Sequence, residues 1–466
     1  MPALLEVGSE LAALSYSSHD GRCEQQWTLV IGCAMQEVKE ETVERFATFR
    51  RRFPFATNVV VLSSGASLGH LFTLAAAPIL TRLYLPDDIG NLGLFNAFLA
   101  VAAVAASLQY DVAIVSTPSQ REAAQLAIVS TALTLPMSMA GGFLLYIMIH
   151  FSLVGFGVLP VYAAGLMVLT ILFAGLFSIL RYWSLRDEQF NAVSRALIFQ
   201  NGGRSLSQVA LGAIGLHSFG LLFGEVVGRS IGMSRMMRNA WPVVRRYGFS
   251  AHDIAIALKS NRQFPLYSAP SSLLNVLGTS LPLPLLVTLY GADVGGYYSL
   301  VWRVLAVPVV LIGASMADAF HSRAALYVRE DPRHLLRFFH STTMALLGMG
   351  IIPALMVFAF GEPIFLFVFG IKWRLSGIIA SIVAPWFLMS FIVSPLSRIV
   401  YVLRGQRLKL IYDLLIVGGN LAVFFAARHL AWPMLYMVTV MSAMNTTSKV
   451  IYYFVLFRIT ATSIRS

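Results

Sequence analysis

Three basic residues lie inside long apolar stretches of the sequence. Such residues usually face a protein interior, because a charge exposed to lipid is costly. Arg204 has Gln200 and Gln208 one helical turn away on either side, so that face of its helix is polar. Arg303 and Lys449 lie in two further apolar stretches. The three cations could donate charge-assisted hydrogen bonds to an anionic ligand. Alternatively, each charge is neutralised within the protein and has only a structural role.

Polar side chains also follow one face of two other apolar stretches. His70 shares a helix face with Ser63 and Ser67, and Asn275 shares one with Ser272. Two helices that line a shared cleft would carry such stripes, so His70 and Asn275 are candidate ligand-binding residues. Small polar residues also mediate ordinary helix packing in membranes, and this explanation stays open.

An acid and a base are spaced to pair on one helix. Glu225 and Arg229 stand at positions i and i+4, where an ion pair lowers the cost of burying either charge. The pair is either structural or a site that couples transport to a proton or a sodium ion. Arg398 and Asp413 lie near the ends of apolar stretches, where anchoring at the membrane interface explains them.

The sequence lacks the residue patterns of an enzyme or a metal protein. It contains no paired catalytic carboxylates, no cluster of metal ligands and no nucleotide-binding loop. Its two cysteines, Cys23 and Cys33, do not form the closely spaced pairs of a metal site. We therefore predict a protein that is not an enzyme and that holds no metal and no organic cofactor.

Composition places the chain in a membrane. Of its 466 residues, 57% are hydrophobic and 12% are charged, against about 25% charged residues in soluble domains. The formal net charge of +12 could suggest a nucleic-acid partner. However, the basic residues lie in short connections between apolar stretches, where they set membrane orientation. We therefore predict no nucleic-acid binding.

Apolar stretches of about twenty residues predict about twelve transmembrane helices. They lie near 57–80, 91–115, 125–149, 153–180, 196–216, 219–240, 265–290, 295–319, 340–360, 375–401, 410–430 and 433–457. Basic residues concentrate in every second connection, which the positive-inside rule assigns to the cytoplasm. Both termini are therefore predicted to be cytoplasmic.

The predicted helices divide into two halves. Residues 1–52 form a cytoplasmic extension, with Met35 as an alternative start. The first six helices occupy 53–240, and a basic cytoplasmic linker at 241–264 leads to the other six at 265–457. A cytoplasmic tail at 458–466 follows. Because six is even, both halves have the same orientation, so a pseudo-two-fold axis along the membrane normal should relate them. The predicted fold is an all-α integral membrane protein of two six-helix lobes.

One hairpin occurs in both halves. The stretch Leu80–Ala103 is echoed by Leu286–Val307, and aligning their Leu-Tyr pairs also aligns a proline in the preceding helix. A one-residue gap then aligns two turn glycines, Gly90 and Gly295. Each copy is predicted to be two helices joined by a short turn. Two similar lobes that face each other would enclose a cleft.

The segments PILTRLYLPDDIGNLGLF, SLQYDVAIV and QFPLYSAPSSLLNVLGTSLPLPLLVTLYGADVGGYYSLVWRVLAVP resemble polysaccharide-export proteins of the Wzx type. These belong to the multidrug/oligosaccharidyl-lipid/polysaccharide (MOP) exporter superfamily. The resemblance implies a flippase of the bacterial inner membrane that works by alternating access. Its cargo would be an undecaprenyl-pyrophosphate-linked oligosaccharide, moved to the periplasmic leaflet for O-antigen or exopolysaccharide biosynthesis.

The resemblance also implies partners and a site. Membrane lipids, a polysaccharide polymerase and a chain-length regulator are candidate partners, and H⁺, Na⁺ or the membrane potential would drive transport. Arg204, Arg303 and Lys449 would bind pyrophosphate and acidic sugars. The alternatives are a cation-coupled multidrug exporter or a lipid II flippase of the same superfamily, or a membrane-embedded polysaccharide polymerase. Deep cations outnumber deep acids in the sequence, which favours an anionic cargo.

Overall fold

The computed structural model describes residues 54–117, 119–247, 250–330, 332–403 and 405–462. The chain divides into two compact units, Met1–Val60 and Val61–Ser466, and nearly all described residues belong to the second. The predicted extension at 1–52 lies outside the described residues, as does the end of the predicted tail. Within the described ranges all regular structure is helical.

The first half of the chain supplies the elements from α3 to α9. They are α3 (Pro54–Leu83), α4 (Pro86–Ala105), α5 (Tyr110–Ser116), α6 (Gln120–His150), η1 (Leu153–Val158), α7 (Tyr162–Arg186), α8 (Phe190–Ala213) and α9 (His217–Ser230). The linker region that follows contains α10 (Ser234–Tyr247) and α11 (Ala251–Ser260).

The second half of the chain supplies the remaining elements. Its elements are η2 (Phe264–Ser268), α12 (Ala269–Ser280), α13 (Pro282–Tyr290), α14 (Ala292–Glu330), α15 (Pro332–Phe369), η3 (Ile371–Trp373), α16 (Arg374–Leu396), α17 (Ile399–Val402), α18 (Gln406–His429) and α19 (Met434–Thr462).

Each predicted span corresponds to helix in the structure. Among the described residues, eight helices are long and apolar enough to cross a membrane, and the bent run of η2, α12 and α13 would be a ninth. The remaining three predicted spans correspond to α8, α9 and α19. Arg204 and Lys449 make α8 and α19 less apolar, and α9 has only 14 residues.

Five predicted spans are interrupted: the fourth between η1 and α7, the tenth between α16 and α17, and three others. The second ends with α4 at Ala105, and α5 resumes after two residues with positive φ, Leu108 and Gln109. The sixth breaks between α9 and α10, where Gly232 has φ +86°. The seventh bends by 43° where Pro282 begins α13, because proline cannot donate the helical hydrogen bond.

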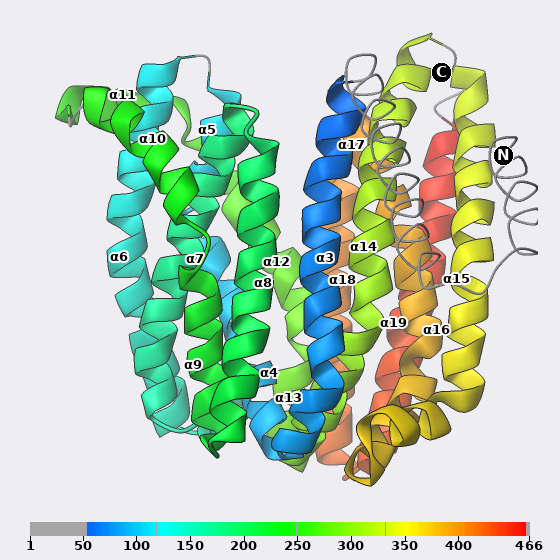
Figure 1. Cartoon of the computed structure of the whole chain (residues 1–466). Coiled ribbons are helices and arrows are strands. Elements are labelled where there is room, and N and C mark those ends of the chain that lie inside the picture. The colour runs from blue at the N-terminus through cyan, green and yellow to red at the C-terminus, as the bar shows by residue number, and fades with distance from the viewer. Residues whose placement is uncertain (1–53, 118, 248–249, 331, 404, 463–466) are drawn as a thin grey trace, which may run out of the picture. The chain divides into compact units, whose positions relative to one another are not determined.

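The region predicted as a linker, 241–264, is largely helical. Its α11 packs against the start of α6, where Arg121 Nη2 lies 2.6 Å from Asp253 Oδ2. Asn261, directly after α11, donates a 2.9 Å hydrogen bond to Glu122 Oε1 of α6. These contacts fix the linker to the first half of the chain. We call the end of the bundle that carries α10 and α11 the linker end (Figure 1).

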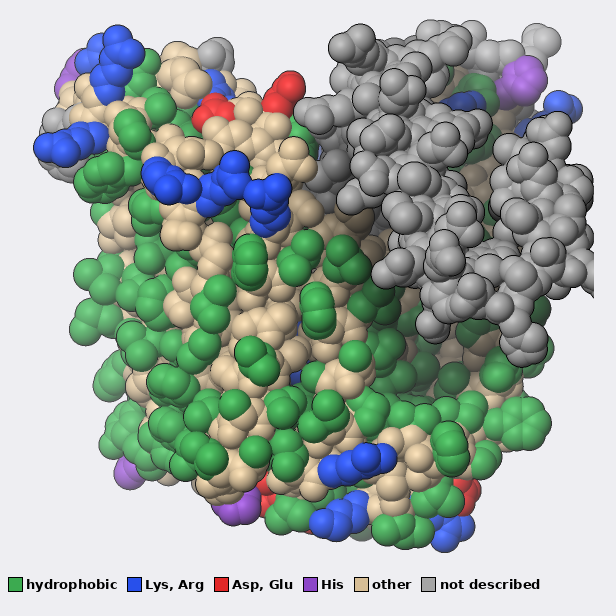
Figure 2. Space-filling view, viewed as in Figure 1, with side chains coloured by type: hydrophobic (Ala, Val, Ile, Leu, Met, Phe, Trp, Pro, Cys, Tyr) green, Lys and Arg blue, Asp and Glu red, His purple; other side chains and the backbone are tan. Residues whose placement is uncertain are grey.

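Apolar side chains cover the middle of the face seen in Figure 2, and basic side chains gather over α10 and α11 above them. Large exposed apolar residues include Phe143, Leu206 and Phe367. On α10, the arginines Arg245 and Arg246 occupy the last turn. An apolar band below a basic rim is the surface expected of a membrane protein.

The two repeated hairpins pack against each other at the opposite end, which we call the hairpin end. There, α4 crosses α14 so closely that a Cβ atom on Gly90 would lie 2.9 Å from the Gly296 nitrogen and closer still to the Ala292 carbonyl. Conversely, a Cβ on Gly296 would collide with the Pro86 carbonyl. Only glycine allows this approach of the two backbones.

These contacts are reciprocal and correct the alignment of the repeat. Pro86 and Ala292 each begin their helix, and Gly90 then corresponds to Gly296 without any gap. In the same register Gly93 corresponds to Ser299, and a Cβ on Gly93 would lie 3.0 Å from the Ser299 Cβ. The gap that aligned Gly90 with Gly295 is therefore unnecessary. Residues related by a two-fold operation meet at its axis, so the pseudo-two-fold axis passes between α4 and α14.

The substitution Gly296→Ala should loosen this crossing, because the new methyl group would lie 2.9 Å from Pro86 Cα and nearer to its carbonyl. Overpacking of this kind costs about 1–3 kcal/mol. We expect a lower thermal unfolding temperature in detergent, measured by size-exclusion chromatography after heating. Gly348→Ala is the matched control, since its Cβ would meet nothing within 4 Å. Equal unfolding temperatures for both variants would contradict the proposed role of the crossing.

Candidate functional site

A cavity of about 370 Å³ lies beside the crossing of α4 and α14. The first half contributes α3, α4 and α8 to its wall, and the second half contributes α12, α13 and α14. Its polar lining comprises His70, Thr73, Asn96, Arg204, Ser299 and Arg303, among others. The wall follows α4 from Ile89 to Ala100, about 16 Å at 1.5 Å per residue. The cavity therefore reaches from the hairpin end deep into the bundle.

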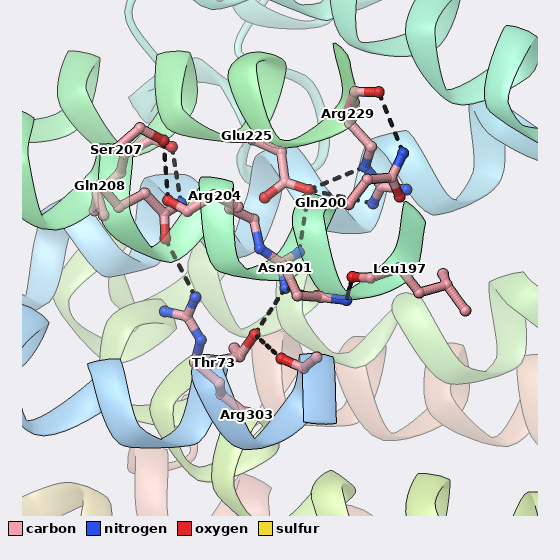
Figure 3. Close-up of polar contacts among 12 residues, drawn as sticks. Thr73, Leu197, Gln200, Asn201, Arg204, Ser207, Gln208, Glu225, Arg229 and Arg303 are labelled. Carbon is pink, nitrogen blue, oxygen red and sulfur yellow. Dashed lines mark hydrogen bonds and ion pairs between the residues drawn. The ribbon is translucent and has the colours of Figure 1, made fainter. Parts of the chain in front are cut away.

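Arg204 contributes a guanidinium group from α8 that contacts three helices. Its Nη2 donates to Asn201 Oδ1 at 2.6 Å on its own helix and to Thr73 Oγ1 at 3.0 Å on α3. Its Nη1 lies 3.4 Å from Glu225 Oε1 on α9. Figure 3 shows the Arg204 side chain between Glu225 and Thr73. These contacts hold the guanidinium at the cavity wall.

Glu225 is the acid of this cluster, and its side chain is 1% exposed. Besides Arg204, its Oε1 accepts a hydrogen bond from Arg229 Nε and lies 3.2 Å from Arg229 Nη2. Arg303 comes from α14, and its Nη2 donates to Gln208 Oε1 at 3.4 Å. Two arginines thus contact the one carboxylate and a third contacts a neutral amide, which leaves a formal excess of two positive charges.

The excess charge faces the cavity. Arg204 and Arg303 both line it, and they come from the two different halves of the chain. Arg204 shares its carboxylate with Arg229, and the hydrogen-bond partner of Arg303 is a neutral amide. Both guanidinium groups therefore keep donor capacity for an anion, and guanidinium binds phosphate and carboxylate oxygens in a well-defined geometry.

A second cavity of about 570 Å³ lies within the second half of the chain. Lys449 of α19 and Asn275 of α12 line it, together with Lys409 and Asp413 of α18. Lys409 Nζ lies 2.7 Å from both carboxylate oxygens of Asp413 and 3.1 Å from Asn275 Oδ1. Arg398 adds a further cation to the wall.

The two cavities are neighbours, because Thr279, Trp302 and Ala306 line both. All five sequence-predicted binding residues line one or the other: Arg204, Arg303 and His70 the first, and Lys449 and Asn275 the second. The ion pair between Glu225 and Arg229 is present, and it also includes Arg204. Whether these residues bind a ligand stays a prediction.

Sequence reasoning missed several members of both sites. Asp413 and Arg398 were expected at the interface, but Asp413 is buried in its ion pair and both residues line the second cavity. The spacing of Lys409 and Asp413 at i and i+4 could have indicated their pairing. Thr73 and Asn201 gave no signal, since small polar residues occur throughout such helices.

Comparison with solved structures identifies the fold. The chain matches an inward-facing multidrug resistance MATE family transporter of the MOP superfamily with a TM-score of 0.63 and 13% identity, over 88% of this chain and 99% of that one. It matches the lipid II flippase MurJ in an inward closed conformation with a TM-score of 0.66 and 15% identity, over 87% and 91%. A third match is a MOP superfamily transporter from Pyrococcus furiosus, described as having a binding pocket of reverse polarity. Its TM-score is 0.57 and its sequence identity 14%, over 88% of this chain and 96% of that one.

These matches confirm the predicted fold class, an all-helical membrane protein of two lobes. The protein is thus a multi-pass membrane protein with the fold of MOP superfamily transporters, and the solved structures it resembles are transporters and a flippase.

The family described as "Polysaccharide biosynthesis protein" matches residues 79–377, more than half of the chain. The chain therefore belongs to this family of polysaccharide biosynthesis proteins. Together with the fold, this confirms the resemblance to the polysaccharide branch of the superfamily. No curated protein matches the chain in sequence.

The substitution Glu225→Gln should destabilise the protein, because it leaves Arg204 and Arg229 without their shared carboxylate. Removing one partner of a buried ion pair lowers the free energy of unfolding by up to about 3–5 kcal/mol. We expect a smaller loss here, because the side chains of Arg204 and Arg229 remain 19% and 34% exposed to solvent. We expect a clear drop in the thermal unfolding temperature.

The matched control is Glu362→Gln, whose carboxylate pairs with Arg374 at 2.6 Å on the surface, with side chains 37% and 62% exposed. An exposed pair contributes only about 0–1 kcal/mol. Equal unfolding temperatures for the two variants would contradict a central role for Glu225.

Proposed function

We propose that the protein is a flippase of the bacterial inner membrane. Its cargo is an undecaprenyl-pyrophosphate-linked oligosaccharide, which it moves from the cytoplasmic to the periplasmic leaflet for O-antigen or exopolysaccharide biosynthesis. The family supports a role in polysaccharide biosynthesis. The observation that carries the proposal is the pair of arginines, one from each half of the chain, that line the cavity between the halves.

Arg204 and Arg303 suit the pyrophosphate of this cargo. A sugar head with a pyrophosphate cannot cross hydrocarbon without polar contacts, and charge-assisted hydrogen bonds from guanidinium supply them. Because the arginines belong to different halves, an anion bound by both would draw the halves together. A ligand shifts a conformational equilibrium by its difference in affinity for the two states, so cargo binding would favour a particular arrangement of the lobes.

The packing suggests which side of the cleft is closed. The glycine crossing of α4 and α14 seals the hairpin end, and the cavity extends from there toward the linker end. With the predicted orientation, the linker end is cytoplasmic and the hairpin end periplasmic. The structure would then represent the state that closes the periplasmic side, ready to receive cargo from the cytoplasmic leaflet.

The membrane potential is a sufficient driving force in this proposal. Pyrophosphate is anionic, and moving one charge across 100 mV changes its free energy by about 2.3 kcal/mol. An interior that is negative therefore favours outward movement of the cargo. Coupling to H⁺ or Na⁺ through Glu225 is the alternative. Transport by proteoliposomes under a potassium diffusion potential, without a proton or sodium gradient, distinguishes the two.

The charge of the cleft argues against a multidrug exporter for organic cations. Such a transporter needs acids at its binding site, whereas arginine and lysine predominate around both cavities. A polysaccharide polymerase has no support from the structural matches, which are transporters and a flippase. A polymerase and a chain-length regulator would instead act on the flipped product.

The direct experiment measures lipid-linked saccharide by leaflet in a deletion strain, using a glycan-cleaving enzyme restricted to the periplasm. Accumulation of undecaprenyl-linked saccharide on the cytoplasmic side, with loss of surface polysaccharide, is the expected result. Normal surface polysaccharide together with hypersensitivity to cationic dyes would move the assignment to drug export.

The substitutions Arg204→Gln and Arg303→Gln should each slow flipping by about tenfold or more, because a hydrogen bond to a charged group contributes about 1.5–3 kcal/mol. Surface polysaccharide in the complemented deletion strain is the readout, with membrane insertion checked by immunoblot. Arg374→Gln is the control, since Arg374 lies in an exposed surface pair. Full export by both cavity variants would refute their assignment.

A further inference from the structure

Helix α10, at the linker end, packs on the bundle by one face only. Its residues Met236 and Ala240 are buried in a core that they form with side chains of α6, α7 and α8. Asn239 fixes the helix further, because its Nδ2 donates to Gln189 Oε1 at 2.7 Å in the turn between α7 and α8. The opposite face of α10 is left uncovered by the described residues.

This uncovered face of α10 is basic. Its four arginines are all exposed: Arg235, Arg238, Arg245 and Arg246. Spacings of seven and eleven residues bring them to one side of the helix, away from the buried face. None of the four forms a hydrogen bond or an ion pair within the part of the chain that the structure describes. Like charges at such spacings repel one another, so the face calls for an anion.

Trp241 indicates where this face lies. It is 57% exposed, and Met237, one turn before it, is exposed as well. Both lie on the flank between the buried face and the arginines. Hydrocarbon would suit these two side chains but not four unpaired guanidinium groups, and water would suit only the arginines. At the level of the headgroups, the indole reaches acyl chains and the guanidinium groups reach phosphates. Figure 2 agrees, since basic side chains over α10 border the apolar band.

We propose that the basic face of α10 is a binding site for the headgroups of anionic phospholipids. Clusters of about four to eight basic residues on an amphipathic helix attract such lipids. Guanidinium groups bind phosphate oxygens through paired hydrogen bonds. Four positive charges without counter-ions also select a lipid of net negative charge over a zwitterionic one. The site lies outside both cavities and does not depend on the identity of the cargo.

A lipid bound at this site would also position α9. Only the residues Ile231–Met233 separate the two helices. Glu225 and Arg229, which form part of the charged cluster, both lie on α9. A lipid that holds α10 at the membrane surface therefore fixes the adjoining end of the helix that carries the buried carboxylate.

Fluorescence quenching can identify the lipid beside Trp241. The full-length protein is placed in nanodiscs of equal parts phosphatidylglycerol and phosphatidylcholine, with brominated acyl chains on one lipid or the other. The Trp241 signal is the difference between the unaltered protein and Trp241→Phe. At about fivefold preference for each arginine, phosphatidylglycerol should occupy the site almost completely. We therefore expect strong quenching by brominated phosphatidylglycerol and weak quenching by brominated phosphatidylcholine.

The double substitution Arg238→Gln with Arg245→Gln should lower the preference by about 25-fold, since two charges are lost. The matched control is Lys372→Gln with Arg428→Gln, which removes two exposed charges outside the linker and should leave the preference unchanged. Equal quenching by the two lipids in the unaltered protein would overturn the proposal and leave the arginines to an acidic partner protein. A preference that survives the loss of Arg238 and Arg245 would overturn it too.

Thermal unfolding separates a lipid headgroup from a free anion. A ligand that binds only the folded state stabilises it, so discs with phosphatidylglycerol should raise the unfolding temperature above that in pure phosphatidylcholine. This gain should shrink in the Arg238 and Arg245 double variant and persist in the control. If inorganic phosphate added to phosphatidylcholine discs gives the same gain, the site takes a free anion and the proposal fails.

Discussion

The close crossing of α4 and α14 is the contact on which the rest of the structure depends. The two backbones can come this close only where neither helix has a side chain at the point of contact. Gly90 and Gly296 meet this requirement. The crossing joins the halves near their pseudo-symmetry axis at the hairpin end. It also sets how far α4 and α14 diverge, and these helices form much of the first cavity wall.

Electrostatic compensation is the second constraint. A lone charge inside a membrane protein is unfavourable, so Glu225 lies among arginines from its own helix and from α8. The compensation is incomplete in both cavities. Arg303 and Lys449 lack a carboxylate partner within the described residues, and both line a cavity. Cations left uncompensated at a cavity wall can donate charge-assisted hydrogen bonds to an anion, as the proposed function requires.

The fold was more predictable from the sequence than the site. The spans, the two halves and the repeated hairpin followed from apolar length and from matching residues, which are local properties. The breaks at Gly232 and Pro282 follow from backbone chemistry, although the sequence did not show that α10 would form a separate helix. Arg204 was identified as a deep cation, but its contact with Glu225 crosses between helices and could not be inferred from helical periodicity.

The sequence by itself determined that the chain is a helical membrane protein with two related halves and an excess of deep positive charge. These properties depend on which residues lie within each apolar stretch. Only the tertiary structure decided that Arg204 and Arg303 share one cavity and that Lys449 lies with Lys409 and Asp413 in another. The reason is physical: packing between helices fixes the rotation and depth of each one, and a span's own sequence constrains these only weakly.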